Sequence, residues 1–159
     1  MPSADFLGKA EPVFTFQYLC TFTAISNLTP LYVAKVNVPD GTWEEVSSGY
    51  FVSMRKFASK FKLDNCTLDI KDFVDVDSAA AIYAWSQRVG DPIAGTLNPP
   101  SQYKSSGVLI VTDGRGSPLN TWTMGGCWPS KCTFGNFESD TGTIIQINIT
   151  VAVDTLVMG

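Results

Sequence analysis

The 159-residue chain contains no histidine. It therefore lacks the imidazole that Ser-His and Cys-His nucleophile pairs need, and it has no histidine to act as a general base. The sequence also holds no P-loop, no dinucleotide-binding glycine motif and no zinc-protease motif. These absences argue against most catalytic designs, so we expect a protein that is not an enzyme and uses no cofactor.

Charge is scarce as well. Charged residues make up 16% of the chain, against about 25% in an average globular protein. The net charge of −4, from 11 basic and 15 acidic residues, argues against tight binding to nucleic acid or anionic membranes. No apolar run approaches the roughly 18 residues of a transmembrane helix, and 1–12 lack the pattern of a signal peptide. We therefore expect one globular domain over 1–159, without a membrane partner and with protein partners covering its surface.

The four cysteines do not have the spacing of a metal site. Structural zinc sites take ligands in close pairs, whereas only Cys127 and Cys132 are near each other in the sequence. Cys20, Cys66 and Cys132 fall on apolar strand faces, so we expect buried thiols that act as small apolar side chains. Cys127, in a Gly-Gly stretch, is expected to be the most exposed of the four. A disulfide among the four, within or between subunits, stays open.

Most of the chain alternates apolar and polar residues with a period of two, which predicts β-strands with one buried side. The alternation is clear in 13–25, 31–38, 65–71 and 143–156, and 107–113, 119–126 and 130–136 are predicted as further strands. In the second of these, the predicted inward residues are Tyr32, Ala34, Val36 and Val38.

Three segments interrupt this pattern. Residues 42–63 are less regular and predict a long excursion with room for a short hairpin. The stretch 125–132, GGCWPSKC, is interpreted as a turn set by Trp128-Pro129. A helix is predicted over about 77–89, because Asp77 or Ser78 can cap it and an alanine-rich run follows with an apolar stripe at helical spacing. The fold class is therefore mainly β, an antiparallel sandwich or half-barrel with one flanking helix.

The order of these elements resembles the tail tube proteins of contractile-tailed bacteriophages, which are related to the tube proteins of type VI secretion systems. The segments that carry the resemblance are PLYVAKVNVP (30–39), FKLDNCTLDI (61–70), AIYAWSQRVGD (81–91), VLIVTDGRGSP (108–118), NTWTMGGCWPSKCTFG (120–135) and TIIQINITVAVD (143–154). They span nearly the whole chain.

The resemblance implies a structural protein of the virion tail that is assembled in the bacterial cytoplasm. Hexameric rings would stack into a hollow tube, and ring assembly would complete a β-barrel around the lumen. The implied partners are other copies of the chain, the tail sheath, the tape-measure protein, the baseplate and the tail terminator. The genome would pass through the lumen, whose wall we expect to be acidic or neutral so that DNA slides without binding.

Two sets of residues are candidates for these contacts. The polar strand faces suggest a lumen wall, with an ordinary solvent-facing surface as the alternative; they carry Thr15, Gln17, Thr21, Thr23, Gln146, Asn148, Thr150 and Asp154. The excursion suggests contacts between rings through opposite charges, or else a solvated loop; its charged candidates are Glu44, Glu45, Arg55, Lys56 and Lys60.

Two other functions remain open. One is a tube of the type VI secretion kind that carries effectors. The other is a β-sandwich module for carbohydrate binding or adhesion, in which Trp43, Trp122 and Trp128 would stack on sugars.

Overall fold

The protein was analysed as a computed structural model, which describes residues 13, 15–25, 33–72, 77–140 and 142–159. The predicted inward residue Tyr32 lies outside this part of the chain. The main elements are β1 (Tyr18–Phe22), η1 (Thr23–Ile25), β2 (Val33–Val36), β3 (Gly41–Tyr50), β4 (Ser53–Leu63), β5 (Cys66–Lys71), α2 (Ser78–Gln87), β6 (Gly90–Asp91), β7 (Thr96–Leu97), α3 (Pro100–Tyr103), β8 (Ser105–Thr112), β9 (Pro118–Thr133), β10 (Gln146–Ala152) and β11 (Thr155–Met158).

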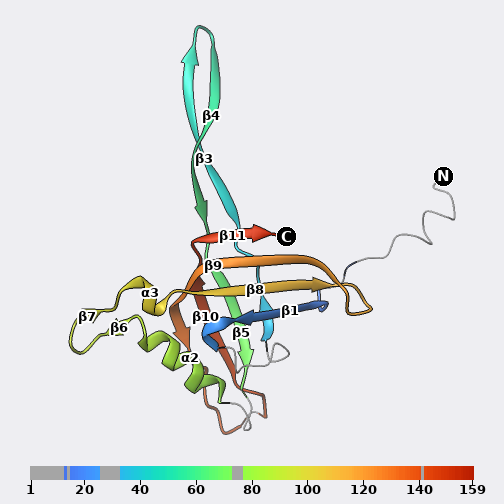
Figure 1. Cartoon of the computed structure of the whole chain (residues 1–159), viewed down its shortest axis with the longest axis vertical. Coiled ribbons are helices and arrows are strands. Elements are labelled where there is room, and N and C mark those ends of the chain that lie inside the picture. The colour runs from blue at the N-terminus through green and yellow to red at the C-terminus, as the bar shows by residue number, and fades with distance from the viewer. Residues whose placement is uncertain (1–12, 14, 26–32, 73–76, 141) are drawn as a thin grey trace, which may run out of the picture.

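One antiparallel sheet organises the body of the molecule, with the strand order β1-β8-β9-β10-β5-β2 and β11 also paired to β9. The first half of β9 pairs with β8 and β11, whereas its second half pairs with β10. We call β1, β8, the first half of β9 and β11 sheet A, and the second half of β9, β10, β5 and β2 sheet B. The barrel does not close in the single chain, and α2 packs beside it (Figure 1). The predicted mainly-β half-barrel with one main flanking helix is confirmed.

The stretch GGCWPSKC is not a turn, contrary to the sequence interpretation. It lies inside β9, a single strand that passes from sheet A to sheet B, so the separate strands predicted at 119–126 and 130–136 are one element. Gly126 stands at this passage with φ +65, and a Cβ there would collide with the Asp154 carboxylate. Glycine therefore lets the strand change sheets without ending.

The core lies between the two sheets. Sheet A contributes Cys20, Phe22, Leu109 and Met124, and sheet B contributes Cys66, Leu68, Ile70, Ile147, Ile149 and Val151. The alternation predicted for 65–71 and 143–156 is confirmed over the strands β5 and β10. Burying these side chains supplies the main favourable free energy of folding.

The first two predicted strands are shorter than the pattern suggested. β1 begins at Tyr18, and Phe16 before it is 73% exposed. In β2, Val33 is buried and Ala34 is exposed, the reverse of the prediction. The register shifts between Val33 and Lys35 against β5, and such a bulge inverts the inside-outside pattern of the residues that follow or precede it.

Helix α2 is close to its predicted position. The Asp77 carboxylate accepts a hydrogen bond from the Ala80 N–H at 3.0 Å, which caps the first turn. Ile82 and Trp85 are fully buried, and the Trp85 indole N–H donates to the Tyr103 carbonyl at 3.3 Å. This bond ties α2 to α3, the short helix that precedes β8.

Replacing Trp85 with alanine should destabilise the protein by about 3–5 kcal/mol, because a fully buried indole leaves a large cavity. Chemical denaturation followed by circular dichroism measures the change. Tyr83→Ala, on the exposed side of the same helix, is the control, and we expect it to cost less than about 1 kcal/mol. Equal losses in the two variants would contradict the packing role of Trp85.

Replacing Gly126 with alanine should also destabilise the fold, by about 1–3 kcal/mol, because the left-handed backbone is strained for a residue with a Cβ and Asp154 occupies the space. Gly116→Ala is the matched control, since Gly116 also has a positive φ but no neighbouring atom near its Cβ position. The difference between the denaturation midpoints of the two variants measures the cost of crowding against Asp154. Equal midpoints would mean that Asp154 moves aside without cost.

Candidate assembly surfaces

The outer face of sheet A carries no charge. Register and alternation place Thr21, Val108, Thr123 and Val157 in one cross-strand row, with Leu19, Ile110 and Thr121 in the next. None of the strand segments that form sheet A contains Asp, Glu, Lys or Arg. Its apolar side chains are partly exposed, such as Leu19 at 37% and Val157 at 62%. This face is therefore better suited to a protein contact than to open water.

The outer face of sheet B is mainly polar. One row holds Lys131, Thr150 and Thr67, and the next holds Thr133, Asn148, Asp69 and Lys35. Gln146 and Lys71 are paired at the end of the face. Hydroxyl, amide and charged groups leave it well hydrated.

The eight predicted lumen residues do not form one surface. Thr21 lies on the outer face of sheet A, whereas Gln146, Asn148 and Thr150 lie on that of sheet B, with the core between the two sets. Thr15 and Gln17 precede β1 in the chain. Thr23 lies in η1, where its hydroxyl bonds to Ser106. A single channel wall can therefore include one of the two strand faces but not both.

Asp154, the last of the eight predicted lumen residues, lies between β10 and β11 and on neither strand face. It follows β10, and its carboxylate pairs with the Lys104 ammonium at 2.5 Å. That hydrogen bond raises the pKa of Lys104. The Asp154 N–H donates to the Gly125 carbonyl at 3.0 Å. Asp154 therefore bonds to β9 at the point where this strand passes from sheet A to sheet B.

The excursion is a long hairpin, not a short one. β3 and β4 pair with each other as a separate two-stranded sheet, and Figure 1 shows this hairpin projecting far beyond the body. We call residues 41–63 the arm. A two-stranded hairpin alone is at best marginally stable in water, so contacts with another protein surface would stabilise the arm.

Apolar side chains cover both faces of the arm. Trp43 lies opposite Phe61, with ring centroids 4.9 Å apart, and Val46 lies opposite Phe57 on the other face. The tip carries Phe51, which is 93% exposed and has φ +51, an unusual backbone for an aromatic residue. Exposed apolar surface of this kind marks an interaction site. The sequence pattern pointed to the charges of this segment as contacts between rings and to Trp43 as a sugar-stacking residue, but it did not point to Val46, Phe51, Phe57 or Phe61.

The charges predicted to meet across rings are partly engaged within the arm. Lys56 pairs with Glu45 at 3.5 Å, and the Arg55 guanidinium lies 5.2 Å from the centroid of the Tyr50 ring. Glu44 and Lys60 are exposed on the same hairpin. Because an exposed ion pair contributes little, the apolar side chains offer the larger contact energy.

The cysteines are free thiols. Cys20, Cys66 and Cys127 are buried, and burial raises their pKa values to about 12, 12 and 11. The expectation that Cys127 is the most exposed is wrong, because the strand continues through the Gly-Gly stretch and carries it into the core. Cys132 is the half-buried one. Within the described residues, no group of three His, Cys, Asp or Glu is placed to hold a metal.

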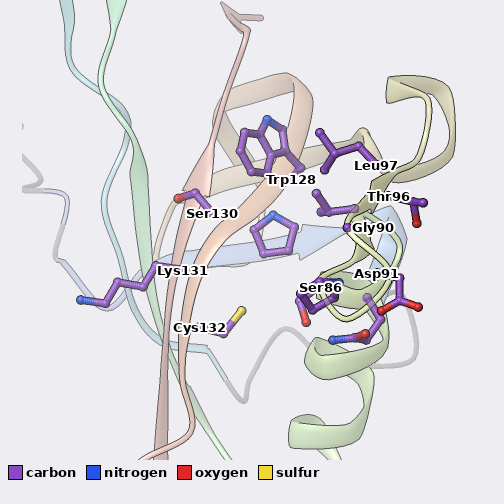
Figure 2. Close-up of a pocket in the computed structure, with 14 residues that line it drawn as sticks. Ser86, Gly90, Asp91, Thr96, Leu97, Trp128, Ser130, Lys131 and Cys132 are labelled. Atoms are coloured by element: carbon purple, nitrogen blue, oxygen red, sulfur yellow. The ribbon is translucent and has the colours of Figure 1, made fainter.

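A cavity of about 550 Å³ opens beside the second half of β9. Its lining from that strand includes Trp128 and Cys132, and across from them lie Asp91 and Leu97 of the segment after α2 (Figure 2). The Asp91 carboxylate accepts hydrogen bonds from the Ile93 and Ala94 N–H groups, so it is used structurally. The Lys131 side chain points away from this cavity, to the outer side of sheet B (Figure 2).

Comparison with solved structures identifies the fold. The chain matches a chain from the sheath–tube complex of an extracellular contractile injection system (PVC) in the extended state, with TM-score 0.75, 15% identity and coverage of 100% of this chain and 99% of that one. It also matches the tube-terminating cap of the anti-feeding prophage (TM-score 0.74, 17% identity, 94% and 92% covered) and the PVC sheath/tube terminator (TM-score 0.75, 16% identity, 95% and 99% covered).

The chain therefore has the fold found in the tube, cap and terminator components of contractile injection systems. No family model and no curated protein matches its sequence. In the part of the chain that the structure describes, no helix is long and apolar enough to cross a lipid bilayer.

In the folded monomer at pH 8, a thiol reagent should modify Cys132 quickly and the other three cysteines only on unfolding. The reason is that burial both blocks access and keeps those thiols protonated. Because the folded state raises the pKa of the buried thiols, their protonation contributes to the free energy of unfolding below the usual thiol pKa. This contribution is lost as the pH rises toward 11–12. Cys132→Ser should abolish the fast reaction; a fast reaction that persists in this variant would contradict the assignment.

Proposed function

We propose that this chain is the structural subunit of a hollow tube in a contractile tail or injection system, in which rings of the subunit stack along an axis. The observation that carries the proposal is the projecting arm, whose apolar faces have no counterpart to cover them within the described chain. The shared fold with injection-system components supports it.

Ring closure has a structural basis in the open edges of the half-barrel. In the strand order, β2 stands at one end of sheet B, and the second half of β9 stands at the other. Since sheet B has four strands that alternate in direction, β2 of one copy would meet β9 of the next in an antiparallel arrangement. Ring assembly would in this way satisfy edge groups that a single copy leaves open, and would complete a barrel.

The two outer faces differ in polarity, so each suits a different environment in the assembled tube. The face of sheet B, with Gln146, Asn148 and Thr150, suits the wet wall of a channel. The uncharged face of sheet A, with Thr21 and Val157, suits a dry contact with surrounding protein, for which a sheath is the natural candidate. Of the eight predicted lumen residues, we therefore retain the three on β10.

The arm is proposed to reach the next ring. Its apolar residues on both faces would be buried between neighbouring copies, with Phe51 and Val52 of the tip inserted deepest. The Glu45–Lys56 ion pair and the Arg55–Tyr50 contact would then fix the register of the contact between rings and add little to its strength.

More specifically, we propose a tail tube. The related folds suggest that it contacts a terminator, a sheath and a baseplate. In a virion the lumen would hold a tape-measure protein and then conduct the genome, and in an injection system it would carry effector proteins. Both uses need the same rings. The carbohydrate-binding alternative is disfavoured, because Trp43 is on the arm, whereas Trp122 and Trp128 are half-buried in β9, so the three rings form no common platform.

Electron microscopy of concentrated purified protein tests the proposal. We expect rings and tubes of uniform diameter for the natural chain. The double variant Phe51→Ser/Val52→Ser should form rings that stack poorly, with the concentration needed for tubes raised about tenfold or more, since each lost apolar burial costs about 1.5–3 kcal/mol.

Ile93→Ser is the matched control, because Ile93 is an equally exposed apolar residue outside the arm; its tubes should be unaffected. A natural chain that stays monomeric at all concentrations would refute the tube proposal. Tubes that form equally well in the tip variant would retain the tube but remove the arm from the contact between rings.

A further inference from the structure

The outer face of sheet B carries a net positive charge. The described strand residues of this face include Lys35, Lys71 and Lys131 but a single acidic residue, Asp69. The chain as a whole is acidic, at −4. The sign of this face is therefore opposite to that of the molecule as a whole.

The positions of the lysines spread the charge over the whole face. Lys35 and Asp69 are register partners on β2 and β5, and Lys71 follows Asp69 two positions later on β5. Lys131 lies at the opposite side of the face, separated from β5 by Thr150 of β10. No ion pair joins these groups in the described structure. One carboxylate cannot neutralise three ammonium groups, so the face keeps a net positive charge.

Between the lysines the face presents hydrogen-bonding side chains. Thr67, Asn148 and Gln146 are arranged on adjacent strands. The outward residues include no arginine and no aromatic side chain, the groups that proteins use to grip phosphates and to stack on bases. Three isolated lysines among hydroxyls and amides match an extended carboxylate-rich polypeptide, which carries at most one charge per roughly 3.3 Å, better than duplex DNA, which carries one charge per about 1.7 Å.

We propose that this face, lining the channel of the assembled tube, holds acidic protein cargo. The inference rests on the proposed tube function, because only ring assembly turns the face of each copy into a closed wall. In a narrow channel the low-dielectric protein wall focuses the field of repeated lysines, which attracts and retains carboxylate-rich polypeptide. This reverses the acidic or neutral lumen expected from the overall charge.

The test uses assembled tubes and two labelled probes, polyglutamate and a short DNA duplex, at about 0.15 M salt, where the Debye length is about 8 Å. Co-sedimentation measures retention, and cryo-electron microscopy shows whether density lies on the tube axis. We expect polyglutamate to be retained on the axis and released by high salt. Lys35→Gln/Lys131→Gln should lower its retention about tenfold.

Two matched variants make the result specific. Arg88→Gln/Arg115→Gln removes the same charge outside sheet B and should leave retention unchanged. Lys35→Arg/Lys131→Arg keeps the charge and should restore retention if the glutamine variant assembles poorly.

Retention of DNA above that of polyglutamate, an equal loss in the control variant, or polyglutamate bound only to the outside of the tube would each overturn the cargo proposal while the tube stands. Failure of the natural chain to form tubes would overturn both proposals.

Discussion

The structure depends on one constraint, which is that a single antiparallel sheet turns onto itself through β9 without closing. The two halves of β9 need different neighbours, and Gly126, held against Asp154, lets the strand change sheets. The inner faces of both sheets then share one core, which Trp85 of α2 joins, and β2 and the second half of β9 stand at the two ends of sheet B. A closed barrel would bury the same apolar residues but would have no edges with which to assemble.

The same arrangement separates three kinds of surface on one small domain. The face of sheet A is uncharged and partly apolar, the face of sheet B is polar and basic, and the arm is apolar on both of its faces. For a monomer in water this would be a poor design, because apolar side chains such as Phe51 gain nothing from exposure. For a subunit in a stacked ring, each surface can meet a different environment, namely surrounding protein, a wet channel and the next ring.

Much of the fold could be predicted from periodicity. The strands β5, β8 and β10 and the capped helix after Asp77 follow local patterns in which each side chain's burial is set by its neighbours two or four positions away. Prediction failed where a non-local pairing overrode the local signal. Trp128-Pro129 has the composition of a turn, yet β10 pairs with this segment and keeps it extended. The bulge at Ala34 likewise depends on β5, which is distant in the sequence.

The candidate surfaces show the same division. The polarity of each strand face was visible in the alternation, and so was the outward direction of Lys35 and Lys71. Which faces share a surface was not visible, because Thr21 and Asn148 look equivalent in the sequence although the core separates them. The sequence by itself determined the β class, the helix and the inner and outer side of most strands, since these follow from local periodicity. Only the tertiary structure decided which strands are edges, that the arm is a projecting hairpin and that the polar face is basic, because each depends on strands brought together from distant parts of the chain.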